Sequence, residues 1–236
     1  MSALINRYLL EQTRHDSGEL VQPDFVVHPY TRAGRYQLDI FRHGKPHASL
    51  FIDVDAECSE KQLSIDLAAT GKRATPSDCG CKSTAHAYRL DKEGYALFYV
   101  GSGAGGFSVK SYPVSARDTD LLFDSQHLNN GHLFGTTLLR PGRYRIEELH
   151  RKISVPLVVA PVKPGSTRYV PPDALQLDLD ALKNHKDGIR LQQAQGLVFR
   201  AEHDNRIRIV LDDKESERDR RPSQAARWTR ASAKRA

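Results

Sequence analysis

The residues most suited to chemistry are two cysteines with a histidine nearby. Cys79 and Cys81 are separated by one glycine, His86 follows five residues later, and Cys58 lies upstream. Thiolate and imidazole groups hold structural zinc, which takes four ligands in a tetrahedron. Because the Cys-x-Cys spacing is tighter than the usual two-residue spacing, we expect free, oxidisable thiols and no cofactor. Zinc held by these four residues is the competing hypothesis.

A second group of metal-type side chains is the histidine pair His127 and His132, which flanks an Asn-Asn-Gly turn. A turn between them keeps both rings from lying on one helix face, so the arrangement of a helical metalloprotease site is excluded. We expect solvated turn histidines. The alternative is a metal site that these two histidines share with a carboxylate.

The glycine-rich segment 101–106 matches the dinucleotide pattern G-x-G-x-x-G by letter. That pattern binds a pyrophosphate only where a helix begins after the glycines. An alternating strand pattern follows here instead, so we predict a hairpin loop. The sequence contains no nucleophile elbow, Walker loop or kinase motif. It therefore names no catalytic residue and favours a protein without enzymatic activity.

The elements that would position these residues are short strands. Residues 34–40, 49–57 and 206–211 alternate apolar and polar side chains, and Gly, Pro, Asn and Asp separate such runs. This pattern predicts an all-β, antiparallel sandwich, preceded by a short amphipathic helix within residues 3–13. The expected organisation is a helix and linker, two sandwich units and a basic tail, at residues 1–22, 23–115, 116–213 and 214–236.

The chain repeats itself at an offset of 108 residues, where TRAGRYQLD (31–39) aligns with LRPGRYRIE (139–147). The shared glycines, Gly34 and Gly142, suit a turn with positive φ at the start of a strand. Tyr36 and Tyr144 are then the first inward residues of equivalent strands. The repeat predicts an internal duplication into two related sandwich units of about 100 residues each.

The second unit contains a further pattern in residues 175–179, 189–194 and 197–200. This succession resembles the opening strands of a cupredoxin-like sandwich. Cupredoxins bind copper through a cysteine and a histidine of a late loop, and no cysteine follows Cys81 here. The resemblance therefore implies a topology and not a copper site.

The net charge of +6 is concentrated at the C-terminus. Residues 214–236 are charged and poor in core residues, which predicts a disordered tail. Because exposed basic side chains bind polyanions by releasing counterions, nucleic acid is a candidate partner through this tail only. The residues that would make the contact are Arg218, Arg220, Arg221, Arg227, Arg230, Lys234 and Arg235.

No segment of the 236 residues reaches the roughly 18 consecutive apolar positions of a membrane helix, so no membrane association is expected. Three cysteines are an odd number for a disulfide framework and predict reduced thiols in a cytoplasmic protein. The sequence favours a non-enzymatic structural or partner-binding protein that docks on another protein or on its own copies. A metal-binding protein or metal-dependent enzyme is the first alternative, and polyanion tethering through the tail is the second.

Overall fold

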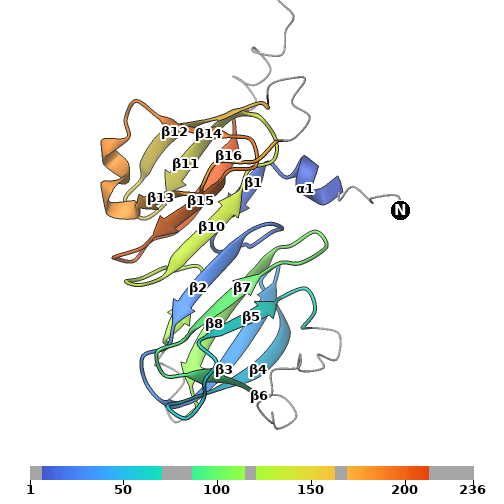
Figure 1. Ribbon diagram of the computed structural model, residues 1–236, viewed down its shortest axis with the longest axis vertical. Helices are drawn as coiled ribbons and strands as arrows, with labels where there is room; N and C mark the ends of the chain where they lie inside the picture. The colour runs from blue at the N-terminus through green and yellow to red at the C-terminus, as the bar shows by residue number, and fades with distance from the viewer. Residues whose placement is uncertain (1–6, 71–86, 115–120, 163–168, 213–236) are drawn as a thin grey trace, which may run out of the picture.

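The computed structural model describes residues 7–70, 87–114, 121–162 and 169–212. Within these ranges the chain consists mostly of β-strands, as the alternating pattern predicted. Figure 1 shows one sheet in each half of the molecule and a central sheet that runs through both halves. The helices in the described ranges are α1 (Arg7–Glu11) and the 3-10 helix η1 (Leu179–Asn184). Among the described residues, no helix has the length and apolar character needed to cross a membrane.

The order of the strands across each sheet differs from their order along the chain. Across the first sheet, each strand hydrogen-bonded to the next, lie β6 (Ala87–Asp91), β4 (Lys45–Asp55), β3 (Gly34–Arg42), β8 (Phe107–Pro113) and β9 (Phe123–Asp124). Across the second sheet, again with each strand hydrogen-bonded to the next, lie β1 (Arg14–Asp16), β16 (Ile207–Leu211), β11 (Gly142–Glu148), β12 (Ile153–Ala160) and β14 (Ile189–Gln192). The central sheet contains β13 (Leu175–Asp178), β15 (Gly196–Arg200), β10 (Leu133–Thr137), β2 (Phe25–Pro29), β7 (Tyr95–Tyr99) and β5 (Gln62–Asp66).

The predicted antiparallel sandwich is wrong, because each of the three sheets mixes parallel and antiparallel strands. β4 pairs in parallel with β6, β5 with β7, β12 with β14 and β13 with β15. Between the members of each such pair the chain crosses to another sheet and returns. It therefore forms a β-solenoid of about three turns with mixed sheets. Alternation reports which face of a strand is buried but not the direction of its neighbour, so the sequence pattern could not distinguish the two folds.

The cupredoxin-like topology is not present either. β13 and β15 are parallel neighbours in the central sheet, whereas β14, between them in sequence, lies beside β12 in the second sheet. The predicted hairpin at residues 101–106 is also wrong, since this loop joins β7 and β8 of different sheets. Close packing requires glycine at position 105, where a Cβ would lie 2.6 Å from the Val21 Cα. A strand and not a helix follows the loop, as expected.

One set of strand pairings occurs twice along the chain. In the first half, β3 lies between β4 and β8, β6 is parallel to β4, and β7 lies between β2 and β5. In the second half, β11 lies between β12 and β16, β14 is parallel to β12, and β15 lies between β10 and β13. The repeat that the sequence indicates is therefore a repeat of solenoid strands and not of sandwiches.

The repeated tyrosines lie at equivalent buried positions, so this part of the prediction is confirmed. Tyr36 is 5% exposed and Tyr144 is 3% exposed. The Tyr36 hydroxyl donates to the Arg32 carbonyl and the Tyr144 hydroxyl to the Arg140 carbonyl, both at 2.8 Å. Gly34 and Gly142 share a φ of 156°, which residues with a Cβ rarely adopt. Each tyrosine thus fixes the turn that opens its strand.

The two halves exchange their first strands. β1 begins the first half but pairs with β16, whereas β9 begins the second half but pairs with β8. The serines that follow these strands make matching bonds: Ser17 N–H donates to the Ile207 carbonyl at 2.9 Å, and Ser125 N–H to the Val109 carbonyl at 3.0 Å. β1 lies within the predicted linker at residues 1–22, which the structure therefore shows to contribute to a sheet.

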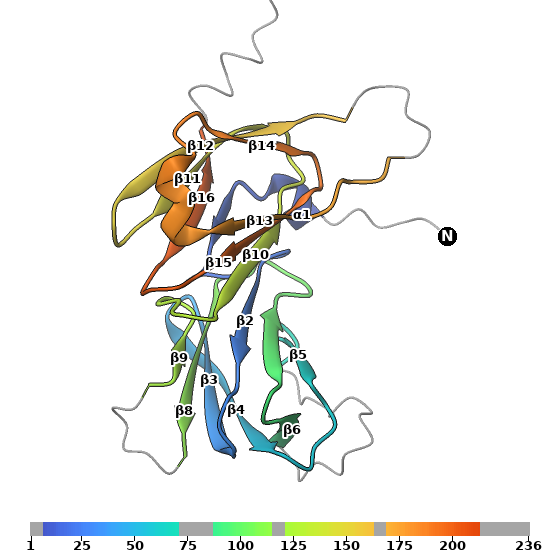
Figure 2. The same ribbon diagram turned by 60° about the vertical axis from the view of Figure 1, so that its left-hand side comes forward.

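The halves meet where β2 and β10 pair in the middle of the central sheet, as Figure 2 shows. Val26 lies opposite Phe134, which is its equivalent 108 positions later. Phe25 lies opposite Gly135, and Val27 opposite Leu133, so the pairing is symmetric under exchange of the halves. A pseudo-twofold axis thus passes between β2 and β10. Each buried feature near this axis has a counterpart across it.

Candidate functional site

The cysteine site predicted from the sequence lies largely outside the described residues. Cys79, Cys81 and His86 fall in residues 71–86, and the basic tail falls in residues 213–236. Cys58 is described: it is a free thiol, 4% exposed, and its N–H donates to Asp55 Oδ1 at 2.8 Å. The described part of the chain therefore provides one member of the proposed zinc set. Polyanion binding by the tail stays a prediction.

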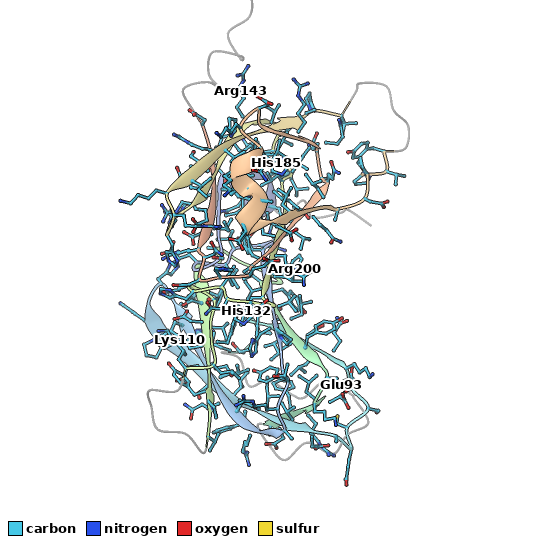
Figure 3. All side chains as sticks on the ribbon, turned by 90° about the vertical axis from the view of Figure 1, so that its left-hand side faces the viewer. Glu93, Lys110, His132, Arg143, His185 and Arg200 are labelled. Carbon is cyan, nitrogen blue, oxygen red and sulfur yellow. The ribbon has the colours of Figure 1, made fainter. Side chains whose placement is uncertain are left out.

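The alternative pair His127 and His132 is not brought together as one site. The His127 side chain is 52% exposed, whereas His132 is 4% exposed. Figure 3 shows His132 at the waist between the halves. Its Nε2 lies 2.9 Å from Nδ1 of His28, and the Phe123 ring stacks on His28 at 4.8 Å between centroids. We call His28 and His132 the buried histidine pair.

The hydrogen bonds of the buried histidine pair define its protons. The N–H of Asn129 donates to His132 Nδ1 at 2.9 Å, so the proton of neutral His132 is on Nε2 and is donated to His28 Nδ1. The proton of His28 is then on Nε2, which is buried without a partner. Burial lowers the pKa of His28 to about 3, with a contribution from His132, and lowers the pKa of His132 to about 4. Both rings of the pair are thus neutral, and the hydrogen bond between their facing nitrogens occupies both of these atoms.

The position across the pseudo-twofold axis is also polar. Asp24, the equivalent of His132, accepts the Val21 N–H at 3.2 Å. Its Oδ1 lies 2.6 Å from His15 Nδ1, and the Thr136 hydroxyl lies 3.0 Å from the same nitrogen. Thr136 and His15 are the equivalents of His28 and Phe123. The backbone arrangement is therefore repeated, while the chemistry differs.

A groove open to ligands lies on the outer face of the central sheet. On β2 the even-numbered Val26 and His28 point into the core, so the odd-numbered residues face the groove. The groove has a volume of about 480 Å³, within the usual range for ligand sites. It extends across β5, β7, β2 and β10 and is lined by Val27, Pro29, Gln62, Tyr95, Leu97, Gly131 and Leu133.

The groove has an apolar floor and a polar rim. Tyr95 is 38% exposed, and its hydroxyl donates to Gln62 Oε1 at 2.7 Å at the edge of the sheet. Arg200 lies opposite Leu133 in register and is exposed. Figure 3 shows Arg200 and Glu93 on the same side of the molecule, one in each half. No carboxylate, imidazole or thiol lines the groove itself, so its lining offers contact area and not proton transfer.

A third group of side chains converges at an exposed corner of the second half. His127 is joined there by His150 and Asp204, whose ligand-type atoms lie within 4.8 Å of one another. The structure thus places a second histidine and a carboxylate beside His127, but that histidine is His150 and not His132. His150 and Asp204 were missed because they lie on separate turns, and only the ladders between β11, β12 and β16 bring these turns together.

Comparison of the chain with models of known protein families, with curated proteins and with solved structures found no match.

Proposed function

We propose that this is a partner-binding protein whose groove on the central sheet holds an extended, apolar segment of another protein. The observation that carries this proposal is the 480 Å³ groove with aliphatic and tyrosine side chains on an open sheet face. Such lining is typical of contact surfaces, where aromatic residues are enriched and charged ones depleted. An exposed apolar patch with a polar rim is the usual mark of an interaction site.

The dimensions favour an extended segment. The groove crosses four adjacent strands, from Gln62 on β5 to Leu133 on β10. At about 4.8 Å between strands, its length is about 14 Å, which an extended chain of four or five residues covers at about 3.3 Å per residue. Alternate side chains of such a segment would enter the floor formed by Val27 and Leu97, while its other side chains would meet the polar rim.

A second copy of this chain is a less suitable partner for the groove than a peptide segment. The whole outer face of the central sheet spans six strands of about five residues, which is about 400 Å² from the spacings of a β-sheet. A stable dimer buries about 800 Å² on each partner. The face is therefore too small for a stable dimer by itself but suits a peptide segment.

The proposal is tested with a displayed library of random ten-residue peptides selected on the full chain. We expect enrichment of peptides with aliphatic or aromatic residues at alternate positions. Replacing Leu97 by Lys places a charge on the groove floor and should weaken the binding of the selected peptides at least about tenfold, as for loss of a central contact. Fluorescence polarisation with a labelled selected peptide measures the affinity.

The matched control is Val198→Lys. Val198 occupies the position in the second half that corresponds to Leu97, on the same face of the central sheet, but it does not line the groove. Its substitution should leave the affinity within about twofold of the wild type. Failure to enrich any peptide, or equal losses in the two variants, would exclude the groove as the binding site.

A further inference from the structure

We propose that His127, His150 and Asp204 form a site for a divalent ion of the zinc class. The three side chains come from three turns: the one before β10, the one between β11 and β12, and the one between β15 and β16. His127 is 77 positions from Asp204 and His150 is 54, but their donor atoms lie within 4.8 Å of one another. This convergence on one point is independent of the groove.

The distances suit a tetrahedral ion. Asp204 Oδ1 lies 3.1 Å from Nδ1 of His127 and 3.5 Å from Nδ1 of His150. Two ligands that bind zinc at about 2.0–2.1 Å with tetrahedral angles lie about 3.3–3.4 Å apart. The two separations fall on either side of this value. The donor atoms of the two histidines lie within 4.8 Å of each other, so rotation of these exposed side chains, without movement of a strand, can bring all three donors to the tetrahedral spacing.

The donor set selects the class of ion. Two imidazoles and one carboxylate suit zinc and its neighbours copper and nickel, whereas magnesium and calcium prefer sites made only of oxygen. Three protein ligands leave a fourth position for water or an external ligand. Both features distinguish this corner from a surface cluster that merely attracts cations.

The backbone beside each ligand is held by a buried polar side chain. Asp124, Glu148 and Asn205 are 4%, 1% and 0% exposed. The Glu148 carboxylate accepts the N–H of His150 at 2.9 Å and that of Arg151 at 2.6 Å, which fixes the turn between β11 and β12. Asp124 Oδ1 accepts a backbone N–H of its own turn, and the Asn205 side chain donates to a carbonyl of the third turn. The three ligands thus project from ordered turns, which reduces the ordering that ion binding requires.

Without an ion, the two imidazoles can donate to the same carboxylate. His150 Nδ1 also lies 3.2 Å from the Asp204 carbonyl oxygen. A metal binds the lone pair of each Nδ1, so in the bound form each neutral ring carries its proton on Nε2 instead.

The test is calorimetric titration of the full chain with zinc chloride. Cys79 and Cys81 are first replaced by Ser, so that their thiolates do not contribute. We expect one zinc per chain, and a loss of affinity of at least about tenfold in each of His127→Ala, His150→Ala and Asp204→Asn. An excess of magnesium should not compete. Circular dichroism verifies that each variant is folded.

The matched control is His203→Ala. His203 is on the same turn as Asp204, is 76% exposed, and faces Asp180 with its Nδ1 3.4 Å from Oδ2. Its removal should change zinc affinity less than about twofold. Absence of binding in the Ser-substituted chain, or an equal loss in His203→Ala, would overturn the proposal. Either result would leave the groove and its peptide test unaffected.

Discussion

The same corner of the fold occurs once in each half, and among the described residues only the corner of the second half brings two histidines and a carboxylate together. Glu19 and Arg42 lie 108 positions before His127 and His150, and Gly106 of the glycine-rich loop takes the place of Asp204. This alignment follows from matching bridges, Leu20 with Phe107 and Leu128 with Asn205. In the first half, Arg42 Nε donates to the carbonyl of Gly105, one residue before the aligned position, at 3.4 Å; in the second half, His150 Nδ1 lies 3.2 Å from the Asp204 carbonyl oxygen.

The two buried clusters beside the pseudo-twofold axis show the same contrast. His132 and Asp24 each accept a backbone N–H from three residues earlier, and each contacts a histidine. One cluster is a neutral imidazole pair, and the other is an imidazole beside a carboxylate. The elements that repeat, namely turns, tyrosines and ladders, are those that form the fold. The positions that differ are therefore the places to search for function.

The largest expected effect is a loss of stability in acid from the buried histidine pair. Both folded pKa values lie below the ordinary value of 6.5, at about 3 and about 4. The unfolded chain therefore binds more protons than the folded chain below about pH 7, and the difference approaches two protons near pH 5. The contribution of the pair is complete above pH 6.5 and is lost as the pH falls toward 4, and it should amount to about 3 to 4 kcal/mol between pH 7 and pH 5. Urea unfolding at each pH measures it.

The variant His28→Thr isolates the contribution of His28. It introduces threonine, which is the residue at the equivalent position 136 across the axis. One titrating group is removed, so the pH slope between 6 and 5 should fall by about 1.4 kcal/mol per pH unit. The carboxylate of Asp16 does not interfere, because its pKa is already below 3.8 and its contribution is lost only near and below that pH. An unchanged slope in His28→Thr would show that the pair is not the origin of the acid sensitivity.

The next largest effect concerns the exchanged strands β1 and β9. Asp16 accepts Arg206 Nε at 2.9 Å and Arg208 Nε at 3.1 Å. Burial raises the pKa of Asp16, but the bonds and charge of Arg206, with Gly18 N–H and Arg208, outweigh burial and hold it below the ordinary value. Its equivalent, Asp124, faces one cation, Lys110, at 3.2 Å. Asp16→Asn should therefore cost about 3 kcal/mol and Asp124→Asn about 1 kcal/mol.

Urea unfolding of the two variants at pH 7 measures this difference. Equal losses would mean that the arginine pair does not stabilise the exchange of β1 more than the lysine stabilises that of β9. A loss below about 1 kcal/mol in Asp16→Asn would show that solvent screens the arginines and that β1 is held by its backbone ladder alone.

The strands and the repeated tyrosines could be predicted because their signals are local. Tyr36 and Tyr144 each bond four residues back, within one short motif that the sequence displays twice. The ladder directions could not be predicted, since each parallel partner is separated by a crossing to another sheet. β1 was missed for a different reason: Arg14, His15 and Asp16 carry no apolar pattern, and the strand is buried through charge pairing.

The candidate metal site shows where prediction from one sequence stops. His127 could be selected as a residue type, but its partners depend on which turns the ladders bring together. Its supposed partner His132 follows five residues later and points into the core, because β10 begins directly after it. The repeat contained one usable signal: Glu19 aligns with His127, so the residue at this position differs between the two halves.

The smallest expected effect tests whether the repeated tyrosine hydroxyl stabilises the two halves equally. Tyr36→Phe and Tyr144→Phe each remove one hydroxyl that donates to a carbonyl four residues earlier, and should each cost about 1 kcal/mol. Tyr95→Phe is the control: its hydroxyl bonds a side chain at an exposed edge, and its loss should stay within about 0.5 kcal/mol. Because the two buried tyrosines lie in different sheets, the double variant should lose the sum of the single losses.

The ring neighbours of the two tyrosines differ. Tyr30 packs on Tyr36 with centroids 4.9 Å apart, and Leu138 replaces Tyr30 in the second half. If urea unfolding shows a loss of stability in only one of Tyr36→Phe and Tyr144→Phe, the ring neighbour, and not the shared hydrogen bond, holds the turn.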